Sequence, residues 1–424
     1  MTVLFTRKSN LRVQGTLVVD GTAGAPVSMS GRSGARWGGI SFENTTTPSS
    51  LRHVVLRGAT KGYDATVYPS AISGLNATLV LDFVDIRECE GPVFCRGGST
   101  TLRDSILQNP YTGDGINVKQ GQAVTQRCVF YGNNQPDTDA IDYDGVVNGL
   151  IEDCRLYRYQ GFNSDGIDIG EACSNILIQR NQIYYNSDKG VSVGQGSTVT
   201  LRHNLVVGCA LGVGIKDSGS TVLIDQNTFY ECDVGVAVYE KNFGDGGGAA
   251  TVTHSIISRS SLSPVSVDAL STCTVDWSLC DTLPMTGTNN QFADPLFVDP
   301  VLLNFQLQPA SPAIDTGDPA HAPDPDLTPA DRGAALTHQA SDYPFTIGET
   351  VVINEILANS ETGADWIELY NRTQSSVDIG GWFLSDDGAD LLKYRIPPGT
   401  VLPPAASPPS TRSPSAPPAS TPTR

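Results

Sequence analysis

A small group of side chains in this sequence could do chemistry together. Asp139, Asp142, Asp165 and Asp168 lie in the stretches "DAIDYD" and "DGIDIG", and Lys189 follows in "SDKGVSVG". Carboxylates that lie close together repel one another unless a proton or a cation neutralises them. Calcium is the cation that we expect, because it accepts many oxygen ligands from flexible carboxylates. The four aspartates are therefore predicted calcium ligands.

Lys189 beside such an ion is a candidate base for β-elimination from a uronate polysaccharide. Calcium would act as a Lewis acid on the substrate carboxylate, and a lysine with a lowered pKa would remove the proton alpha to it. The same aspartates oppose this role, because without the metal they raise the pKa of the lysine. As a test of this role, Lys189→Ala is expected to abolish elimination while leaving the melting temperature nearly unchanged.

Two simpler interpretations stay open. Aspartates are common in solvated turns, where no ion is needed. Lys189 could also form only a salt bridge with Asp165 of the preceding repeat. Lys216 and Arg180 are less well placed as alternative bases.

The elements that position these residues form a repeat. A short strand follows a glycine or alanine at Gly115, Ala140, Gly166, Gly190, Gly212 and Gly235, with separations of 25, 26, 24, 22 and 23 residues. A fixed period of this size, made of short strands, indicates a solenoid.

Strand alternation then predicts columns of side chains that stack from one coil to the next. The column just before the anchor glycine contains Asp114, Asp139, Asp165, Lys189, Leu211 and Val234. An outward column contains Asn117, Asp142, Asp168, Ser192, Gly214 and Ala237, and the next one contains Lys119, Asp144, Gly170, Gly194, Lys216 and Tyr239. A second strand in each repeat aligns Cys128, Cys154, Asn181, Asn204 and Asn227, which predicts an amide ladder.

With these repeats, "WGGISFEN" and "DPLFVDPVLLNFQLQPASPAIDTGDP" (residues 294–319), the chain resembles right-handed parallel β-helix proteins of the pectate-lyase-like type. The resemblance runs from about residue 3 to 320 and implies an all-β solenoid with a C-terminal closing segment. Calcium-dependent lyases of that superfamily combine calcium with a basic side chain, as proposed for Lys189. The resemblance also implies a polysaccharide substrate and an extracellular or cell-surface location.

Two other functions are compatible with these sequence patterns. "NSDGIDIG", "SDKGVSVG" and "VGIKDS" resemble polygalacturonase patterns, in which paired carboxylates hydrolyse a glycosidic bond. The coil with adjacent aspartates is absent, however, and Lys189 stands where a histidine is expected. The other alternative is a non-catalytic surface module that binds glycan or spaces other domains, a role that solenoids also serve.

After residues 1–320 we expect a linker at 321–346 and then a second domain. Residues 347–402 resemble a bacterial lamin-tail domain, an immunoglobulin-like sandwich, through Asn354, Glu355, Asp365, Trp366, Glu368, Asn371, Gly381, Trp382, Ser385 and Asp386. The resemblance stops within the domain, so we expect a partial sandwich. Residues 403–424 are rich in Pro, Ser, Thr and Ala and are predicted to be disordered.

The composition limits the partners. The net charge of -18 disfavours nucleic acid and anionic membranes. An acidic polysaccharide is also repelled unless a local cation intervenes. No signal peptide or membrane-spanning segment is recognisable, and we expect a monomer.

Overall fold

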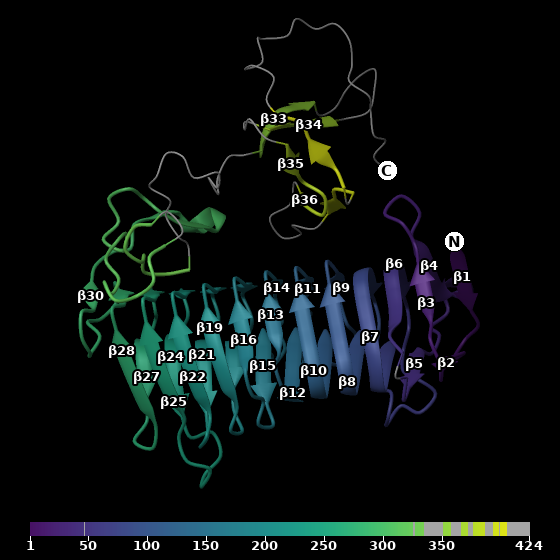
Figure 1. Cartoon of the computed structure of the whole chain (residues 1–424), viewed down its shortest axis with the longest axis horizontal. Coiled ribbons are helices and arrows are strands. Elements are labelled where there is room, and N and C mark those ends of the chain that lie inside the picture. Colours follow the sequence, from purple (N-terminus) through teal and green to yellow (C-terminus); the bar gives the residue numbers. More distant parts are fainter. Residues whose placement is uncertain are drawn as a thin grey trace, which may run out of the picture. The chain divides into compact units, whose positions relative to one another are not determined.

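The computed structural model describes residues 1–45, 47–324, 327–334, 351–357, 366–371, 376–385, 393–397 and 399–404. The chain divides into two compact units, Met1–Thr337 and His338–Arg424. The first unit is a parallel β-helix whose strands pair with the equivalent strands of the preceding and following coils (Figure 1). The predicted all-β solenoid is thereby confirmed.

Each coil contributes to three faces. The first face contains β2 (Leu11–Val13), β5 (Ile40–Glu43), β12 (Ile141–Val146), β15 (Ile167–Gly170), β18 (Lys189–Val193), β21 (Leu211–Lys216), β24 (Val234–Tyr239) and β27 (Ser263–Val267). The second face contains β3 (Val18–Asp20), β13 (Leu150–Glu152), β16 (Ile176–Gln179), β19 (Thr198–Arg202), β22 (Thr221–Asp225), β25 (Ala249–Thr253) and β28 (Thr272–Asp276).

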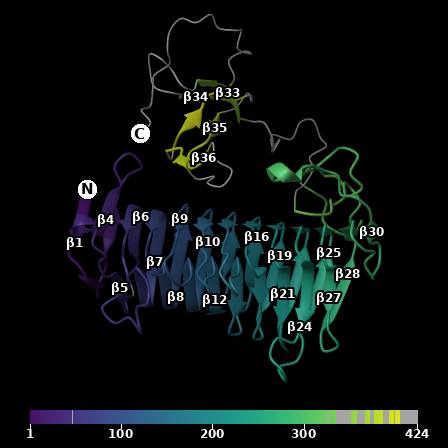
Figure 2. The same ribbon diagram turned by 180° about the vertical axis from the view of Figure 1, so that it is seen from behind.

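The third face contains β1 (Thr2–Phe5), β4 (Val27–Gly31), β9 (Ile106–Gln108), β11 (Val129–Tyr131), β14 (Arg155–Tyr157), β17 (Gln182–Tyr184), β20 (Leu205–Val207), β23 (Thr228–Tyr230), β26 (Ile256–Ser258), β29 (Leu279–Cys280) and β30 (Gln291–Phe292). Longer strands join the faces, namely β6 (Ser49–Arg57), β7 (Ile72–Arg87), β8 (Val93–Arg103) and β10 (Ile116–Gln126). Two views from opposite sides show the strands of successive coils side by side along the whole helix (Figure 2).

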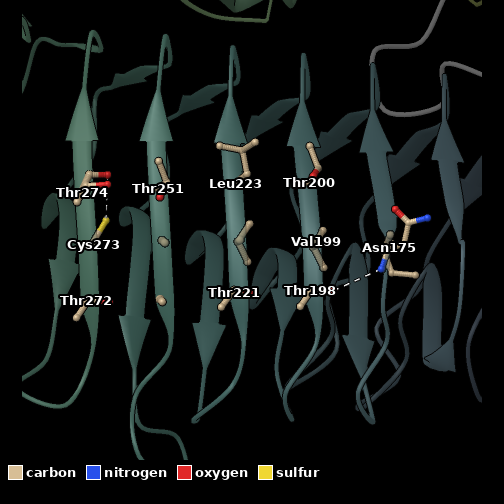
Figure 3. Close-up of a pocket in the computed structure, with 14 residues that line it drawn as sticks. Asn175, Thr198, Val199, Thr200, Thr221, Leu223, Thr251, Thr272, Cys273 and Thr274 are labelled. Carbon is tan, nitrogen blue, oxygen red and sulfur yellow. Dashed lines mark hydrogen bonds between the residues drawn. The ribbon is translucent and has the colours of Figure 1, made fainter.

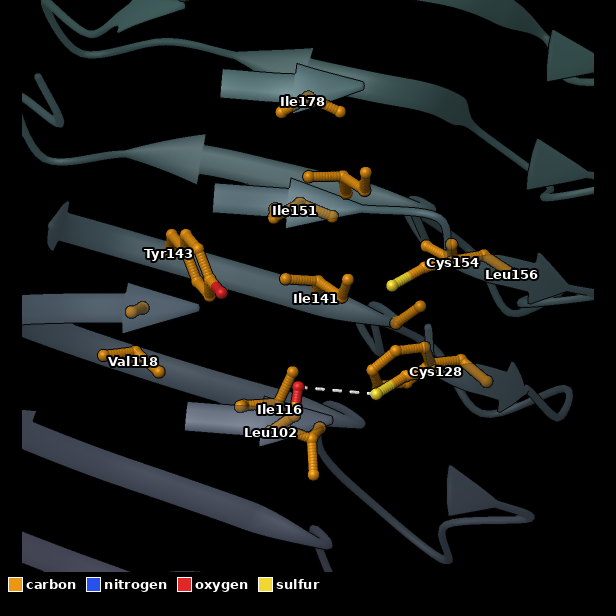
Figure 4. Packing of buried hydrophobic residues seen from close by; sticks show 14 of the residues in the cluster. Leu102, Ile116, Val118, Cys128, Ile141, Tyr143, Ile151, Cys154, Leu156 and Ile178 are labelled. Carbon is orange, nitrogen blue, oxygen red and sulfur yellow. Dashed lines mark hydrogen bonds between the residues drawn. The ribbon is translucent and has the colours of Figure 1, made fainter. Parts of the chain in front are cut away.

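The interior of the helix consists of stacked apolar side chains. One column contains Ile116, Ile141, Ile167, Val191, Val213 and Val236, which pair in register and are each at most 1% exposed. Figure 4 shows how the Ile and Leu side chains of neighbouring coils fill this interior. β-Branched residues suit it because their stiff side chains pack well on a pleated surface. The alternation that buries this column turns its neighbours outward.

The predicted amide ladder forms at the corner between the second and third faces. The Asn204 Oδ1 accepts hydrogen bonds from the amide and the Nδ2 of Asn181, each at 3.0 Å, and its Nδ2 donates to the Ile178 carbonyl at 2.8 Å. Asn227 receives the equivalent bonds from Asn204. The ladder thus provides hydrogen-bond partners for backbone amides and carbonyls at the corner, where the strand pairing is interrupted.

The closing segment, defined here as residues 294–334 without 325 and 326, follows β30. It contains η2 (Pro300–Leu302) and an antiparallel pair, β31 (Phe297–Asp299) and β32 (Asn304–Leu307); a second short helix, η1 (Arg32–Gly34), lies near the N-terminus. The Gly333 amide donates to the His254 carbonyl at 2.7 Å, and the Ala334 amide donates to the Thr228 Oγ1 at 2.9 Å. The expectation that a linker begins at residue 321 is therefore corrected, because the chain stays bonded to the helix up to residue 334.

The second unit contains short antiparallel strands, as a partial sandwich requires. The pairs are β33 (Val351–Leu357) with β34 (Trp366–Asn371), β35 (Val377–Asp378) with β38 (Val401–Leu402), and β36 (Phe383–Leu384) with β37 (Tyr394–Arg395). The predicted disordered tail at 403–424 lies outside the described residues from position 405 onward. Among the described residues, no helical stretch has the length and hydropathy that a membrane span requires.

We predict that Asn204→Ala destabilises the helix by about 2–4 kcal/mol, because it leaves the Asn181 amide and the Ile178 carbonyl buried without their partner. Asn242→Ala is the control, since Asn242 is exposed and its Nδ2 donates to the Asp217 Oδ2 at 3.4 Å. Guanidinium denaturation of the two variants measures the difference. Equal midpoints would show that the ladder adds no stability.

Candidate functional site

The predicted acidic residues gather on the first face, as the column alignment required. Asn117 pairs in register with Asp142, Asp142 with Asp168, and Asp168 with Ser192. We call this region the acidic face; its charged residues are Asp114, Asp139, Asp142, Asp144, Asp165, Asp168, Lys119, Lys189 and Lys216. Aspartates outnumber lysines on it, so a net negative charge stays after every lysine is paired.

The corner column is a ladder of carboxylates bonded to backbone amides. The Asp114 Oδ1 accepts from the Asp139 amide at 2.9 Å, and the Asp139 Oδ1 accepts from the Asp165 amide at 2.6 Å. The Asp165 Oδ1 accepts from the Lys189 amide at 2.8 Å. Each of these carboxylates therefore commits one oxygen to holding the next coil in place.

Lys189 ends this ladder with the opposite charge. Its side chain is 3% exposed, and its Nζ lies 3.4 Å from the Asp165 Oδ1 and also contacts the Asp188 carboxylate. Gly214 leaves room for it, since a Cβ there would lie 2.9 Å from the Lys189 Cδ. Burial lowers the pKa of Lys189, but the Asp165 and Asp188 carboxylates outweigh burial and raise that pKa above its usual value. This geometry supports the salt-bridge interpretation, and the role of Lys189 as a base stays a prediction.

The outward column contains carboxylates with too few neutralising partners. The Asn117 Nδ2 donates to Asp142 and, at 3.0 Å, to the Asp114 Oδ2. Burial, followed by repulsion from Asp114, Asp144 and Asp168, raises the pKa of Asp142 well above its usual value. Such a carboxyl group gains from either a proton or a bound cation.

Two corner carboxyls have raised pKa values for a similar reason. Burial, with repulsion from Asp165 and Asp114, raises the pKa of Asp139 well above its usual value. Burial raises the pKa of Asp165 to about 6, although the charge of Lys189 opposes that shift. The Asp139, Asp142 and Asp165 carboxyls therefore resist ionisation unless a proton or a cation neutralises them.

The next column holds the remaining lysines. The Lys119 Nζ is ion-paired with Asp144 and lies 3.4 Å from the Glu171 Oε1. The Lys216 Nζ lies 3.7 Å from the Asp168 Oδ1. Gly194 accommodates this lysine, because a Cβ there would lie 3.0 Å from the Lys216 Cε. Lys216 is thus nearer to the outward aspartates than its position in the sequence suggested.

Two buried polar atoms on the acidic face have no hydrogen-bond partner. They are the Ser192 Oγ, on a residue that is 0% exposed, and the Asn117 Oδ1. Both are oxygens, and both flank the in-register pair Asp142 and Asp168. These oxygens, together with those of Asp142 and Asp168, are the donors that a hard cation such as calcium prefers, although the Asn117 Nδ2 and the Lys216 Nζ also approach the pair.

The four predicted calcium ligands differ in how many of their carboxylate oxygens are available to bind an ion. No three of them bring ligand oxygens within 4.8 Å of one another. Asp139 and Asp165 each use one oxygen for a backbone amide, whereas Asp142 and Asp168 pair across adjacent coils without that commitment. The ligand set Asp139, Asp142, Asp165 and Asp168 stays a prediction, with Asp142 and Asp168 as the better placed pair.

Sequence reasoning missed one contributor to this face and one group elsewhere on the helix. Asp188 neutralises Lys189 and was recognisable only as the acid beside it in "SDKG".

Asp225, His254 and His321 form another group, and in the described residues it is the group whose ligand atoms lie within 4.8 Å of one another. Nothing in the repeat could have indicated it, because His321 lies in the closing segment.

A separate groove of about 570 Å³ lies on the second face. Its floor carries Thr198, Thr200, Thr221, Thr251, Thr272 and Thr274 from β19, β22, β25 and β28, and Figure 3 shows them in rows across neighbouring strands. The groove has no charged lining residue and shares none with the acidic face. It offers hydroxyl and methyl groups at the spacing of the coils.

Two family models match the chain. Residues 92–245 match the right handed beta helix region, and residues 346–408 match the lamin tail domain. Both resemblances found in the sequence are thereby confirmed for these residues. Among curated proteins, none is similar enough in sequence to match the chain.

Several solved structures have a similar fold. The catalytic unit of a GH87 α-1,3-glucanase from Streptomyces thermodiastaticus strain HF3-3 is 12% identical, with a TM-score of 0.47 over 69% of this chain and 63% of that one. The chain thus spans less than two thirds of that glucanase unit. A pectate lyase is 12% identical, with a TM-score of 0.40 over 78% of this chain and 87% of that one. The A-module of an Azotobacter vinelandii mannuronan C-5 epimerase is 15% identical, with a TM-score of 0.39 over 70% and 91%.

We predict that Lys189→Ala destabilises the helix by roughly 3 kcal/mol, because it leaves Asp165 buried without its cation. This outcome differs from the nearly unchanged melting temperature that the sequence alone led us to expect. Lys61→Ala, at an exposed lysine, is the control. A Lys189→Ala protein that melts within a degree of the parent protein would contradict the importance of the ion pair.

We also predict that Asp142→Asn stabilises the protein at pH 7.5 in the absence of divalent cations. A carboxyl whose pKa is raised by folding stabilises the fold fully only below its unfolded pKa, and that contribution is lost as the pH rises through the folded pKa. The advantage of the Asn variant should therefore shrink towards pH 4. Thermal melts across this pH range test it, with Asp20→Asn as an exposed control. A pH-independent difference would rule out this explanation.

Proposed function

We propose that this chain is an extracellular, carbohydrate-active β-helix protein that acts on a uronate-containing polysaccharide at its acidic face with the help of calcium. The observation that carries the proposal is the in-register pair Asp142 and Asp168 in a surplus of negative charge. The raised pKa of Asp142 indicates that this place is better occupied by a cation than by free carboxylates. The match to a right handed beta helix region supports the fold that the proposal needs, but it does not indicate an activity.

Calcium would be held mainly by Asp142 and Asp168, with Asp139 and Asp165 supplying the oxygens that are not bonded to amides. When bound, the ion supplies neutralisation of the substrate carboxylate. An acidic polysaccharide would then be attracted to a face that otherwise repels it. The surrounding lysines, Lys119 and Lys216, would pair with substrate carboxylates at either side.

The reaction that suits these groups is β-elimination. It requires a base for the proton alpha to the carboxylate, and departure of the 4-oxygen. Lys189 is the predicted base, but its ammonium group must first lose a proton to solvent, a loss that the contacts with the Asp165 and Asp188 carboxylates oppose. Lys216 is the alternative, since its Nζ is held only loosely, 3.7 Å from Asp168.

A non-catalytic glycan-binding function is the second candidate, and the groove on the second face favours it. Rows of threonine hydroxyls repeat at the coil spacing, which suits hydrogen bonding to an extended neutral chain. Neutral glycans would bind there without calcium, whereas uronans would bind the acidic face only with it. The two functions are therefore distinguishable by the ligand and by the effect of a chelator.

We predict that the full chain releases unsaturated products from a panel of uronans with calcium and not with chelator. Absorbance of the new double bond measures the reaction, and calorimetry measures calcium binding. Asp142→Asn/Asp168→Asn should weaken calcium binding by at least about tenfold, whereas Asp20→Asn, on another face, should not. Unchanged calcium binding in the double variant would remove the basis of the proposal.

Lys189→Arg separates the two roles of Lys189. Arginine keeps the positive charge beside Asp165 but does not give up its proton at neutral pH. Loss of elimination with an unchanged melting temperature would identify Lys189 as the base. Full activity would show that Lys189 is only the partner of Asp165, and Lys216→Arg would then be the next variant to measure.

A further inference from the structure

The group Asp225, His254 and His321 lies away from the acidic face, at the place where the closing segment meets the helix. Asp225 ends β22, His254 follows β25, and His321 belongs to the closing segment. Asp225 and His254 are 3% exposed, and the side chain of His321 is 23% exposed. One ligand atom from each lies within 4.8 Å of the others.

The separations fit a shared metal ion. The His254 Nδ1 lies 3.1 Å from the Asp225 Oδ1, and the His321 Nε2 lies 3.3 Å from the Asp225 Oδ2. Two nitrogen or oxygen ligands of one tetrahedral zinc ion, each at about 2 Å from the metal, are about 3.3 Å apart. Imidazole and carboxylate together are a usual donor set for zinc.

The ring of His321 is unsatisfied as a neutral imidazole. Its Nδ1 lies 2.9 Å from the Ala322 carbonyl oxygen, and its Nε2 faces the Asp225 carboxylate. A neutral ring can donate to only one of these two oxygens. Either the ring carries a second proton, or a cation lies between its Nε2 and Asp225.

The surroundings hold the three side chains in place. The closing segment is bonded to this group and to its neighbour: the Asp318 amide donates to the His254 Nε2 at 3.0 Å, and the Asp324 carboxylate accepts from Gln226, which follows Asp225. His203, whose amide donates to the Asp225 carbonyl, has a buried Nδ1 without a hydrogen-bond partner. Arg202 also contacts Asp225, at 3.2 Å, and holds the carboxylate in place from the exposed side.

From this geometry we propose that Asp225, His254 and His321 form a structural site for a zinc-like dication that fastens the closing segment to the β-helix. The ion would bind the His321 Nε2, the Asp225 carboxylate and the His254 Nδ1, with solvent in the fourth position. His254 must move its proton from Nδ1 to Nε2 on loading, which gives up the bond from the Asp318 amide. Zinc binding is therefore coupled to a local change in the turn at Asp318.

The test uses the untagged full chain, stripped with chelator and titrated with zinc chloride in a calorimeter. We expect one zinc ion per chain, and cobalt(II) should give the visible spectrum of a tetrahedral site. His321→Gln should weaken zinc binding by at least about tenfold. His53→Gln, in β6, is the matched control and should bind as the parent protein does, as should Asp142→Asn/Asp168→Asn.

Absence of saturable zinc binding, or equal binding by His321→Gln, overturns the proposal. Amide hydrogen exchange of the parent protein tests the proposal without relying on a variant that could fail to fold. Zinc should slow amide hydrogen exchange in residues 315–324 more than in the coils at residues 72–108. Zinc that binds without slowing exchange in the closing segment would also overturn the proposed fastening role.

Discussion

The register between neighbouring coils is the constraint on which the rest of this structure depends. Parallel strands pair residue for residue, so each side chain lies about 4.8 Å from its equivalent in the next coil. Ile141 pairs with Ile167, Asp142 with Asp168, and Asn204 lies against Asn181 and Asn227. For isoleucine this stacking buries apolar surface, and for asparagine it completes hydrogen bonds. For aspartate the same stacking brings like charges together.

This repulsion is limited at the corner, because one oxygen of each carboxylate accepts a hydrogen bond from a backbone amide. Asp114, Asp139 and Asp165 each accept the amide of the next coil, so the corner aspartates act as structural ladder residues much as the asparagines do at the opposite corner. Lys189 then takes the place of a further aspartate and supplies the positive charge that Asp165 lacks. The change from acid to lysine in the column is thus explained first by folding. Any chemistry at Lys189 has to be compatible with that structural role.

Much of this arrangement could be predicted from the sequence, because residues one repeat apart in a solenoid lie next to each other on neighbouring coils. The three columns were predicted correctly from alternation and period, including the pairing of Asn117 with Asp142 and of Lys216 with Tyr239. The salt bridge of Lys189 with Asp165 was one of the two interpretations of the sequence, but the burial of Lys189 was not predicted. Burial depends on residues of other coils such as Gly214, whose missing Cβ admits the lysine. The closing segment extends past residue 320, where the sequence placed its end, for a similar reason. Arg332 lies far from the repeats in sequence, yet its Nη1 donates to the Ser278 and Asn289 carbonyls.

The two proposed cation sites differ in how the fold produces them. Asp142 and Asp168 meet because the repeat recurs, so adding or removing a residue between them would shift the register and separate them. Asp225, His254 and His321 meet because the repeat ends and a non-repeating segment returns over the last coils. The first arrangement presents charge along an open face, which suits a long polymer that must enter and leave. The second encloses its ligand atoms between the helix and its closing segment, where a bound ion would resist exchange and hold the end of the solenoid. The position of each site thus argues for substrate handling at the first and for stability at the second.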